Sequence, residues 1–170
     1  FLISLYEWYS MSKKKPYFFY GIIYLLISFY SVYLLRNFNI CCKLDDPGLQ
    51  FFLIVITTCI STDLGGYIFG KIFKGPKLTK ISPNKTYSGV YGSFILPIVF
   101  VTLILQNSFF LIKISLDLII FIVLISLVSQ IGDITVSYFK RLSKIKNTGK
   151  VIPGHGGLLD RIDGMIFAFP

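Results

Sequence analysis

The residues of this sequence best suited to chemistry are carboxylates within or beside long apolar runs. Asp63 and Asp133 occupy such positions. An ionised carboxylate there is expensive, so by default it indicates a functional site. The alternative is a structural ion pair with a nearby lysine, or a carboxylate that has reached the aqueous interface. Both runs end on the same predicted side of a membrane, so we expect the two carboxylates to meet at one depth.

A glycine-rich segment, PGHGGLLDRID from Pro153 to Asp163, adds two more carboxylates. Its glycines would let backbone N–H groups approach an anion. Asp160 and Asp163 are three residues apart and would share one face of a helix. With Asp133 they could hold Mg²⁺, which proteins bind through one or two carboxylates plus substrate phosphates. The alternative is a helix N-terminus with acidic residues in its first turn, with His155 as a structural residue.

A second polar segment, KLTKISPNKT at residues 77–86, mixes lysine with serine and threonine. These side chains can bind phosphate by charge and by hydroxyl contact. The alternative is a solvated loop, or one attracted to anionic lipid. No Walker A, Ser-His-Asp or H-E-x-x-H pattern is present. Phosphate-bearing substrates, a divalent metal and a membrane interface together predict an in-line phosphoryl or nucleotidyl transfer.

Long apolar runs must position these groups. Of the 170 residues, 54% are hydrophobic and 15% charged, which excludes a soluble domain, a disordered chain and a disulfide-stapled module. The runs long enough to cross a bilayer are Tyr17–Leu35, Leu49–Phe73, Val90–Ile112 and Leu118–Phe139, and Gly164–Pro170 would begin another. We predict an all-α polytopic membrane protein with about four transmembrane helices plus the start of a fifth. Residues 1–170 would form a single membrane-embedded domain whose ends are incomplete.

The basic residues predict the orientation. The net charge is +9, and 14 of the 17 lysines and arginines precede the first span or follow the second and fourth. The other three are Arg36, Lys43 and Lys113. The positive-inside rule therefore places the long basic loops in the cytoplasm. We expect a multi-pass protein of a bacterial-type inner membrane, with the bilayer as a partner and no nucleic acid.

At these segments the sequence resembles the phosphatidate cytidylyltransferase (CDP-diacylglycerol synthase) family. The family's long C-terminal pattern reads here as SYFKR from Ser137, KN from Lys146 and PGHGGLLDRID through Asp163. Its G-D, D-x-G-A-Y and S-P-x-K-T segments resemble Gly132-Asp133, DLGGY at 63–67 and SPNKT at 82–86. The matching stretches run from 63 to 163. The family usually has Glu at Ser88 and Val136 and Asp at Asn147.

The resemblance implies that CTP and phosphatidate (phosphatidic acid) react to CDP-diacylglycerol and pyrophosphate with Mg²⁺, the phosphatidate oxygen attacking the α-phosphorus of CTP in line. Asp133 and Asp160 would bind the metal, assisted by Asp163; a second cation and a homodimer stay open. The implied catalytic residues are Asp133, Lys140, Arg141, His155, Asp160, Arg161 and Asp163. The implied substrate-binding residues are Asp63, Ser82, Lys85, Thr86, Ser137, Gly156 and Gly157.

Two other functions stay open from the sequence. A CTP-dependent polyprenol or phytol kinase would share the phosphate chemistry but would transfer a terminal phosphate instead of CMP. An ion-coupled transporter or a channel would have Asp63 and Asp133 on its path. A transporter, however, predicts inverted repeats, which the sequence does not show.

Overall fold

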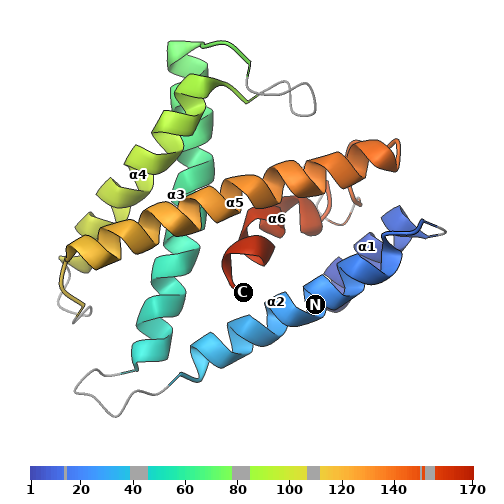
Figure 1. The fold of residues 1–170 in the computed structure, drawn as a ribbon, viewed down its shortest axis with the longest axis horizontal. Helices are drawn as coiled ribbons and strands as arrows, with labels where there is room; N and C mark the ends of the chain where they lie inside the picture. The colour runs from blue at the N-terminus through green and yellow to red at the C-terminus, as the bar shows by residue number, and fades with distance from the viewer. Residues whose placement is uncertain (14, 39–45, 78–84, 107–111, 150, 152–155) are drawn as a thin grey trace.

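The computed structural model describes residues 1–13, 15–38, 46–77, 85–106, 112–149, 151 and 156–170 (Figure 1). Its helices are α1 (Leu2–Ser12), α2 (Phe18–Arg36), α3 (Pro47–Phe73), α4 (Tyr87–Leu105), α5 (Leu116–Leu142) and α6 (Leu159–Ala168). Within these described ranges every regular element is a helix. The predicted all-α fold is confirmed.

Four helices, α2 to α5, are long and apolar enough to cross a membrane. They correspond to the four predicted spans, so the chain is a multi-pass membrane protein. The third span differs from its prediction: the helix runs over Tyr87–Leu105 and not Val90–Ile112. It begins early because the Thr86 hydroxyl caps it, and it ends where polar Gln106 follows the apolar run. The predicted start of a fifth span at Gly164 lies inside α6.

Side-chain caps start three of the long helices. Asp46 accepts the N–H of Leu49 and precedes Pro47, a residue suited to a first helical position because it has no N–H to leave unpaired. Thr86 caps α4, and Ser115 caps α5, in the same way. Local sequence therefore sets where these helices begin.

Helices α3 and α4 form a closely packed pair, crossed by α5, while α6 lies along α5 (Figure 1). Glycines allow this approach: a Cβ on Gly65 would collide with the carbonyl of Gly92, and a Cβ on Gly92 would lie 2.7 Å from the Gly65 oxygen. A Cβ on Gly132 in α5 would lie 2.7 Å from Phe167 of α6. Backbones this close leave little freedom for the helices to slide or rotate.

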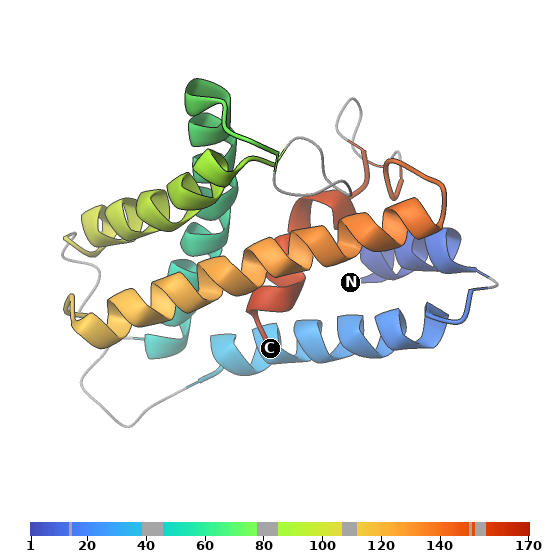
Figure 2. The ribbon, with the colours of Figure 1, turned by 45° about the horizontal axis from the view of Figure 1, so that its top comes forward.

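The short helix α1 was not among the predicted elements. It lies against α2 and contacts α6 (Figure 2). Trp8 and Met11 of α1 form a buried cluster with Leu25, Leu159 and Ile166. The Trp8 indole N–H also donates to the carbonyl of Phe18, 3.1 Å away. The N-terminal segment is thus packed onto the helix that carries Asp160 and Asp163.

Candidate active site

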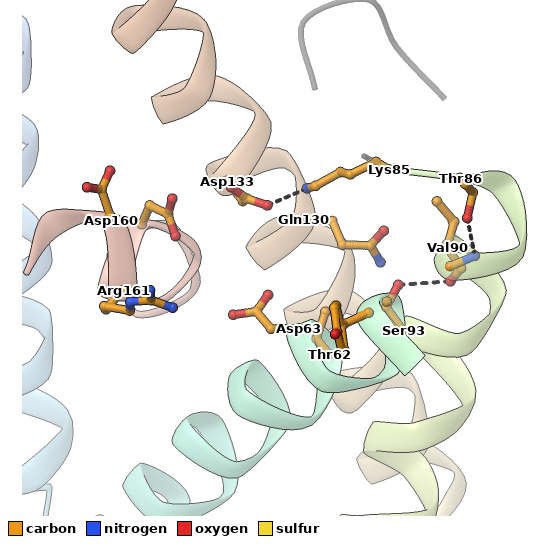
Figure 3. Close-up of a pocket in the computed structure, with 14 residues that line it drawn as sticks. Thr62, Asp63, Lys85, Thr86, Val90, Ser93, Gln130, Asp133, Asp160 and Arg161 are labelled. Atoms are coloured by element: carbon orange, nitrogen blue, oxygen red, sulfur yellow. Dashed lines mark hydrogen bonds and ion pairs between the residues drawn. The ribbon is translucent and has the colours of Figure 1, made fainter. Parts of the chain in front are cut away.

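A polar cavity of about 340 Å³ lies among α3, α4, α5 and α6 (Figure 3). Its lining is Thr62, Asp63, Gly66, Tyr67, Lys85, Thr86, Gly89, Val90, Ser93, Gln130, Asp133, Asp160, Arg161 and Asp163. Four carboxylates and two cationic side chains therefore reach one space from segments far apart in the chain. Of the predicted site residues, Asp63, Lys85, Thr86, Asp133, Asp160, Arg161 and Asp163 lie here.

Asp63 and Asp133 face the same cavity, as the two apolar runs predicted. Asp63 comes from the middle of α3 and Asp133 from the second half of α5 (Figure 3). Beneath them the buried Thr62 hydroxyl donates to Ser126, which donates to the carbonyl of Ser93, so polar contacts join α3, α5 and α4. This arrangement sets the distance between the two carboxylate-bearing helices.

Lys85 reaches across the cavity to Asp133, with Nζ 2.6 Å from Oδ2. Both side chains are about one quarter exposed, at 24% and 28%, so solvent and solutes can reach the pair. The backbone beside Lys85 is held by the antiparallel bridge between Lys77 and Thr86. An ammonium group held at the cavity rim suits contact with a phosphate.

Lys140 binds the two carboxylates of α6. Its Nζ lies 2.9 Å from Oδ1 of Asp160 and 3.7 Å from Oδ2 of Asp163. All three side chains are about nine-tenths buried. Lys140 is not among the residues that line the cavity. Its position among the described residues is that of a counter-ion to Asp160 and Asp163.

The two α6 carboxylates differ electrostatically. Burial would raise the pKa of Asp160, but the N–H of Gly157, the Lys140 ammonium and the N–H of Thr148 outweigh it, so that pKa lies below its ordinary value. Burial, and then the charge of Asp133, raise the pKa of Asp163. Asp163 thus lies close enough to Asp133 for the two negative charges to oppose each other. A cation between them would relieve that repulsion.

The remaining predicted residues lie elsewhere. Ser137 and Arg141 are on the last turns of α5 and do not line the cavity; Arg141 donates to the carbonyl of Ile145 at 3.4 Å. Gly156 and Gly157 precede α6 and likewise do not line it. Gly156 has φ +89°, which favours glycine. Ser82 and His155 lie outside the described residues.

Sequence reasoning missed two polar residues. Gln130 lines the cavity, and its side-chain nitrogen is buried with no hydrogen-bond partner among the described residues. Glu7 is buried in α1 and contacts the segment before α6. A signal for each was present, because Gln130 and Glu7 are polar residues within apolar runs.

The carboxylates suit a metal that is shared with a substrate. In the described part of the chain no group of three or more His, Cys, Asp or Glu residues is arranged to hold a metal. Magnesium typically takes only one or two protein carboxylates and completes its shell with phosphate oxygens and water. Asp133, together with Asp163 or Asp160 from the same cavity lining, could provide such a set. Both oxygens of Asp160 already accept hydrogen bonds, from Lys140, Thr148 and Gly157.

Comparison with known proteins agrees with these observations. The sequence matches the model of the Cytidylyltransferase family over residues 1–170. It is 35% identical over 174 residues to a phosphatidate cytidylyltransferase of Rickettsia bellii, which covers 96% of this chain and 71% of that protein. It is 40% identical over 126 residues to the phosphatidate cytidylyltransferase of Staphylococcus saprophyticus, covering 74% of this chain and 48% of that protein. The matched part is thus about half of the staphylococcal protein. The chain belongs to the cytidylyltransferase family.

Proposed function

We propose that the protein is a phosphatidate cytidylyltransferase that uses CTP and phosphatidate to form CDP-diacylglycerol and pyrophosphate. The observation that carries the proposal is the cavity where Asp63, Asp133 and Asp163 meet Lys85 and Arg161 between membrane-spanning helices. Both substrates bear phosphates, and one of them resides in the bilayer. Relatives that carry this enzyme name support the same assignment.

In the proposed reaction a phosphate oxygen of phosphatidate forms a bond to the α-phosphorus of CTP. The bond from that phosphorus to the bridging oxygen breaks, and pyrophosphate leaves with the electron pair. The nucleophile is already an anionic oxygen, so no strong base is needed. The protein must chiefly align the two phosphates and neutralise their charge.

We assign these tasks from the positions of the side chains. Lys85 and Arg161 line the cavity and would contact phosphate oxygens. Asp133, with a carboxylate of α6, would hold Mg²⁺, which would draw charge from the phosphates during the transfer. Lys140 would keep Asp160 and Asp163 oriented, because its ammonium contacts both. We also place the basic loops and the cavity opening on the cytoplasmic side, the side where CTP is present.

The test uses membranes that contain the full-length protein, phosphatidate, Mg²⁺ and CTP labelled at either the α- or the γ-phosphorus. We expect label in the lipid product only from α-labelled CTP. Lipid labelled from γ-labelled CTP would instead identify a kinase, and no labelled lipid from either would refute the proposal.

Helix α5 carries a second aspartate, Asp117, which provides a matched control for Asp133. Asp133→Asn should lower the rate by at least about 100-fold, because it removes a cavity-lining charge that would face the metal and the phosphates. Asp117→Asn changes an exposed carboxylate in the first turn of the same helix and should leave the rate unchanged. Equal rates for Asp133→Asn and wild type would contradict the assigned role of Asp133.

A further inference from the structure

Glu7 is a buried carboxylate far in sequence from the candidate active site. Its side chain is on α1 and is only 1% exposed. Three donors from the other end of the chain surround it: the Thr148 hydroxyl at 3.1 Å, the Leu158 N–H at 2.9 Å and the Leu159 N–H at 2.7 Å. No ion pair involves Glu7 in the part of the chain that the structure describes. Its negative charge is therefore stabilised by these donors.

The start of α6 depends on this carboxylate. Helix α6 begins at Leu159 without a cap from its own N-cap side chain. The first N–H groups of a helix lack intrahelical partners, and the positive end of the helix dipole attracts an anion. Glu7 accepts two of these N–H groups, from Leu158 and Leu159. A residue of α1 thus caps the helix that bears Asp160 and Asp163.

The carboxylate of Glu7 lies so close to the backbone at Gly149 and Gly157 that a side chain at either position would collide with it. A Cβ on Gly157 would lie 2.6 Å from the Glu7 Oε2, and a Cβ on Gly149 would lie 2.8 Å from its Oε1. Such separations are too short for real carbon–oxygen contacts. The sequence suggested that the glycines between Pro153 and Asp163 let backbone N–H groups approach an anion. At Gly157, which belongs to that segment, the anion that the structure places nearby is the carboxylate of Glu7.

Thr148 connects Glu7 to the active-site carboxylates. Its hydroxyl donates to Glu7, and its N–H donates to Oδ2 of Asp160 at 2.9 Å. The same Asp160 oxygen accepts the N–H of Gly157 at 3.0 Å. Glu7 and Asp160 therefore both accept hydrogen bonds from the same two segments, the one at Thr148 and the one before α6. A shift of either segment would change the position of Asp160 and, through α6, of Asp163.

We propose that Glu7 is a positioning residue of the active site, which sets Thr148 and the start of α6 and thereby orients Asp160 and Asp163. The expected effect on kcat rests on the proposed function. The expected effect on hydrogen-exchange protection of the Leu158 and Leu159 amides is independent of the reaction.

The experiment compares wild type with Glu7→Gln in the full-length protein. Glutamine keeps the size but turns one acceptor oxygen into an NH₂ group that faces N–H or O–H donors. Losing a hydrogen bond to a charged group should speed hydrogen exchange in a peptide covering 156–162 by about 10-fold or more. For the cytidylyl transfer, kcat per folded molecule should fall by about 10- to 100-fold while KM for CTP changes little.

Ser4→Ala is the matched control. Ser4 lies one turn earlier on α1, is also buried, and its hydroxyl has no hydrogen-bond partner among the described residues. This variant should show wild-type exchange and wild-type kcat. Thr148→Val is a second test, because it removes only the hydroxyl that donates to Glu7. Its effects should be smaller and not additive with those of Glu7→Gln.

Either of two results for Glu7→Gln would overturn the inference. One is a wild-type rate of hydrogen exchange at 156–162, and the other is faster exchange with an unchanged kcat per folded molecule. If Glu7→Gln does not accumulate, Thr148→Val decides by the same two measurements, and wild-type values for it would also refute the role. Failure of the wild-type protein to form CDP-diacylglycerol would refute the proposed function alone, since the exchange measurement needs no substrate.

Discussion

Replacing Lys140 with methionine tests the ion-pair cluster beside the cavity. The ammonium lies 2.9 Å from Asp160 and 3.7 Å from Asp163. With an effective dielectric constant of about 20, the shorter separation corresponds to an attraction of about 6 kcal/mol between full charges before the cost of desolvation. The attraction to Asp163 is weaker, because that contact is longer and because burial and the charge of Asp133 raise the pKa of Asp163. The three side chains are about nine-tenths buried, so solvent screens them little. Methionine retains the apolar stem but leaves both carboxylates without their cation.

Removing one partner of a buried ion pair typically costs about 3–5 kcal/mol, because an uncompensated charge remains. We therefore expect Lys140→Met to lower the apparent melting temperature of the full-length protein in detergent. Lys113→Met, which changes an exposed lysine before α5, should have no effect. Adding Asp160→Asn to Lys140→Met should restore part of the lost stability, since the double variant has one fewer buried charge.

An unchanged melting temperature for Lys140→Met would refute this reasoning. A double variant less stable than Lys140→Met would also refute it, because the loss would then arise from packing or from the hydrogen bonds to Asp160. The comparison thus separates the charge of Lys140 from its volume.

Two further substitutions test the cavity and its support. Lys85→Met should raise the KM for CTP by about 10-fold or more, because a charge-assisted phosphate contact is lost. Lys74→Met, at the end of α3, should leave the KM unchanged. Initial rates measured over a range of CTP concentrations give the KM of both variants. Gly65→Ala should destabilise the protein by about 1–3 kcal/mol, because the new Cβ collides with the carbonyl of Gly92. Gly66→Ala, whose Cβ would have no neighbour closer than 3.8 Å, should leave the melting temperature nearly unchanged, and the opposite order of the two variants would contradict the packing of α3 on α4.

Much of the fold was predictable because it depends on local properties of the sequence. A membrane-spanning helix must satisfy its backbone hydrogen bonds internally and must be apolar over about 20 residues, so each span appears as one continuous run. Caps such as Thr86 and Ser115 are equally local, and they explain where α4 and α5 begin. The convergence of Asp63 and Asp133 was predictable because both runs end on the same predicted side of the membrane.

The element α1 was not predictable in this way. Eleven residues are too few to span a bilayer, and no periodic signal distinguishes the segment from an apolar end. Its helix is stabilised by the packing of Trp8 and Met11 on α2 and α6, contacts between residues far apart in the chain. Glu7 consequently received no role from the sequence, although it caps α6.

By itself the sequence determined the four spans and the motifs typical of the cytidylyltransferase family, while the sidedness that its basic loops indicate stays a prediction. Tertiary structure decided which charges face the cavity and which face one another. Lys85 and Lys140 are both basic residues beside a phosphate-type motif, yet Lys85 lines the cavity and Lys140 lies between two buried carboxylates. The reason is physical: a motif specifies residue types along the chain, whereas the partner of a charge depends on how the helices α1, α5 and α6 pack together.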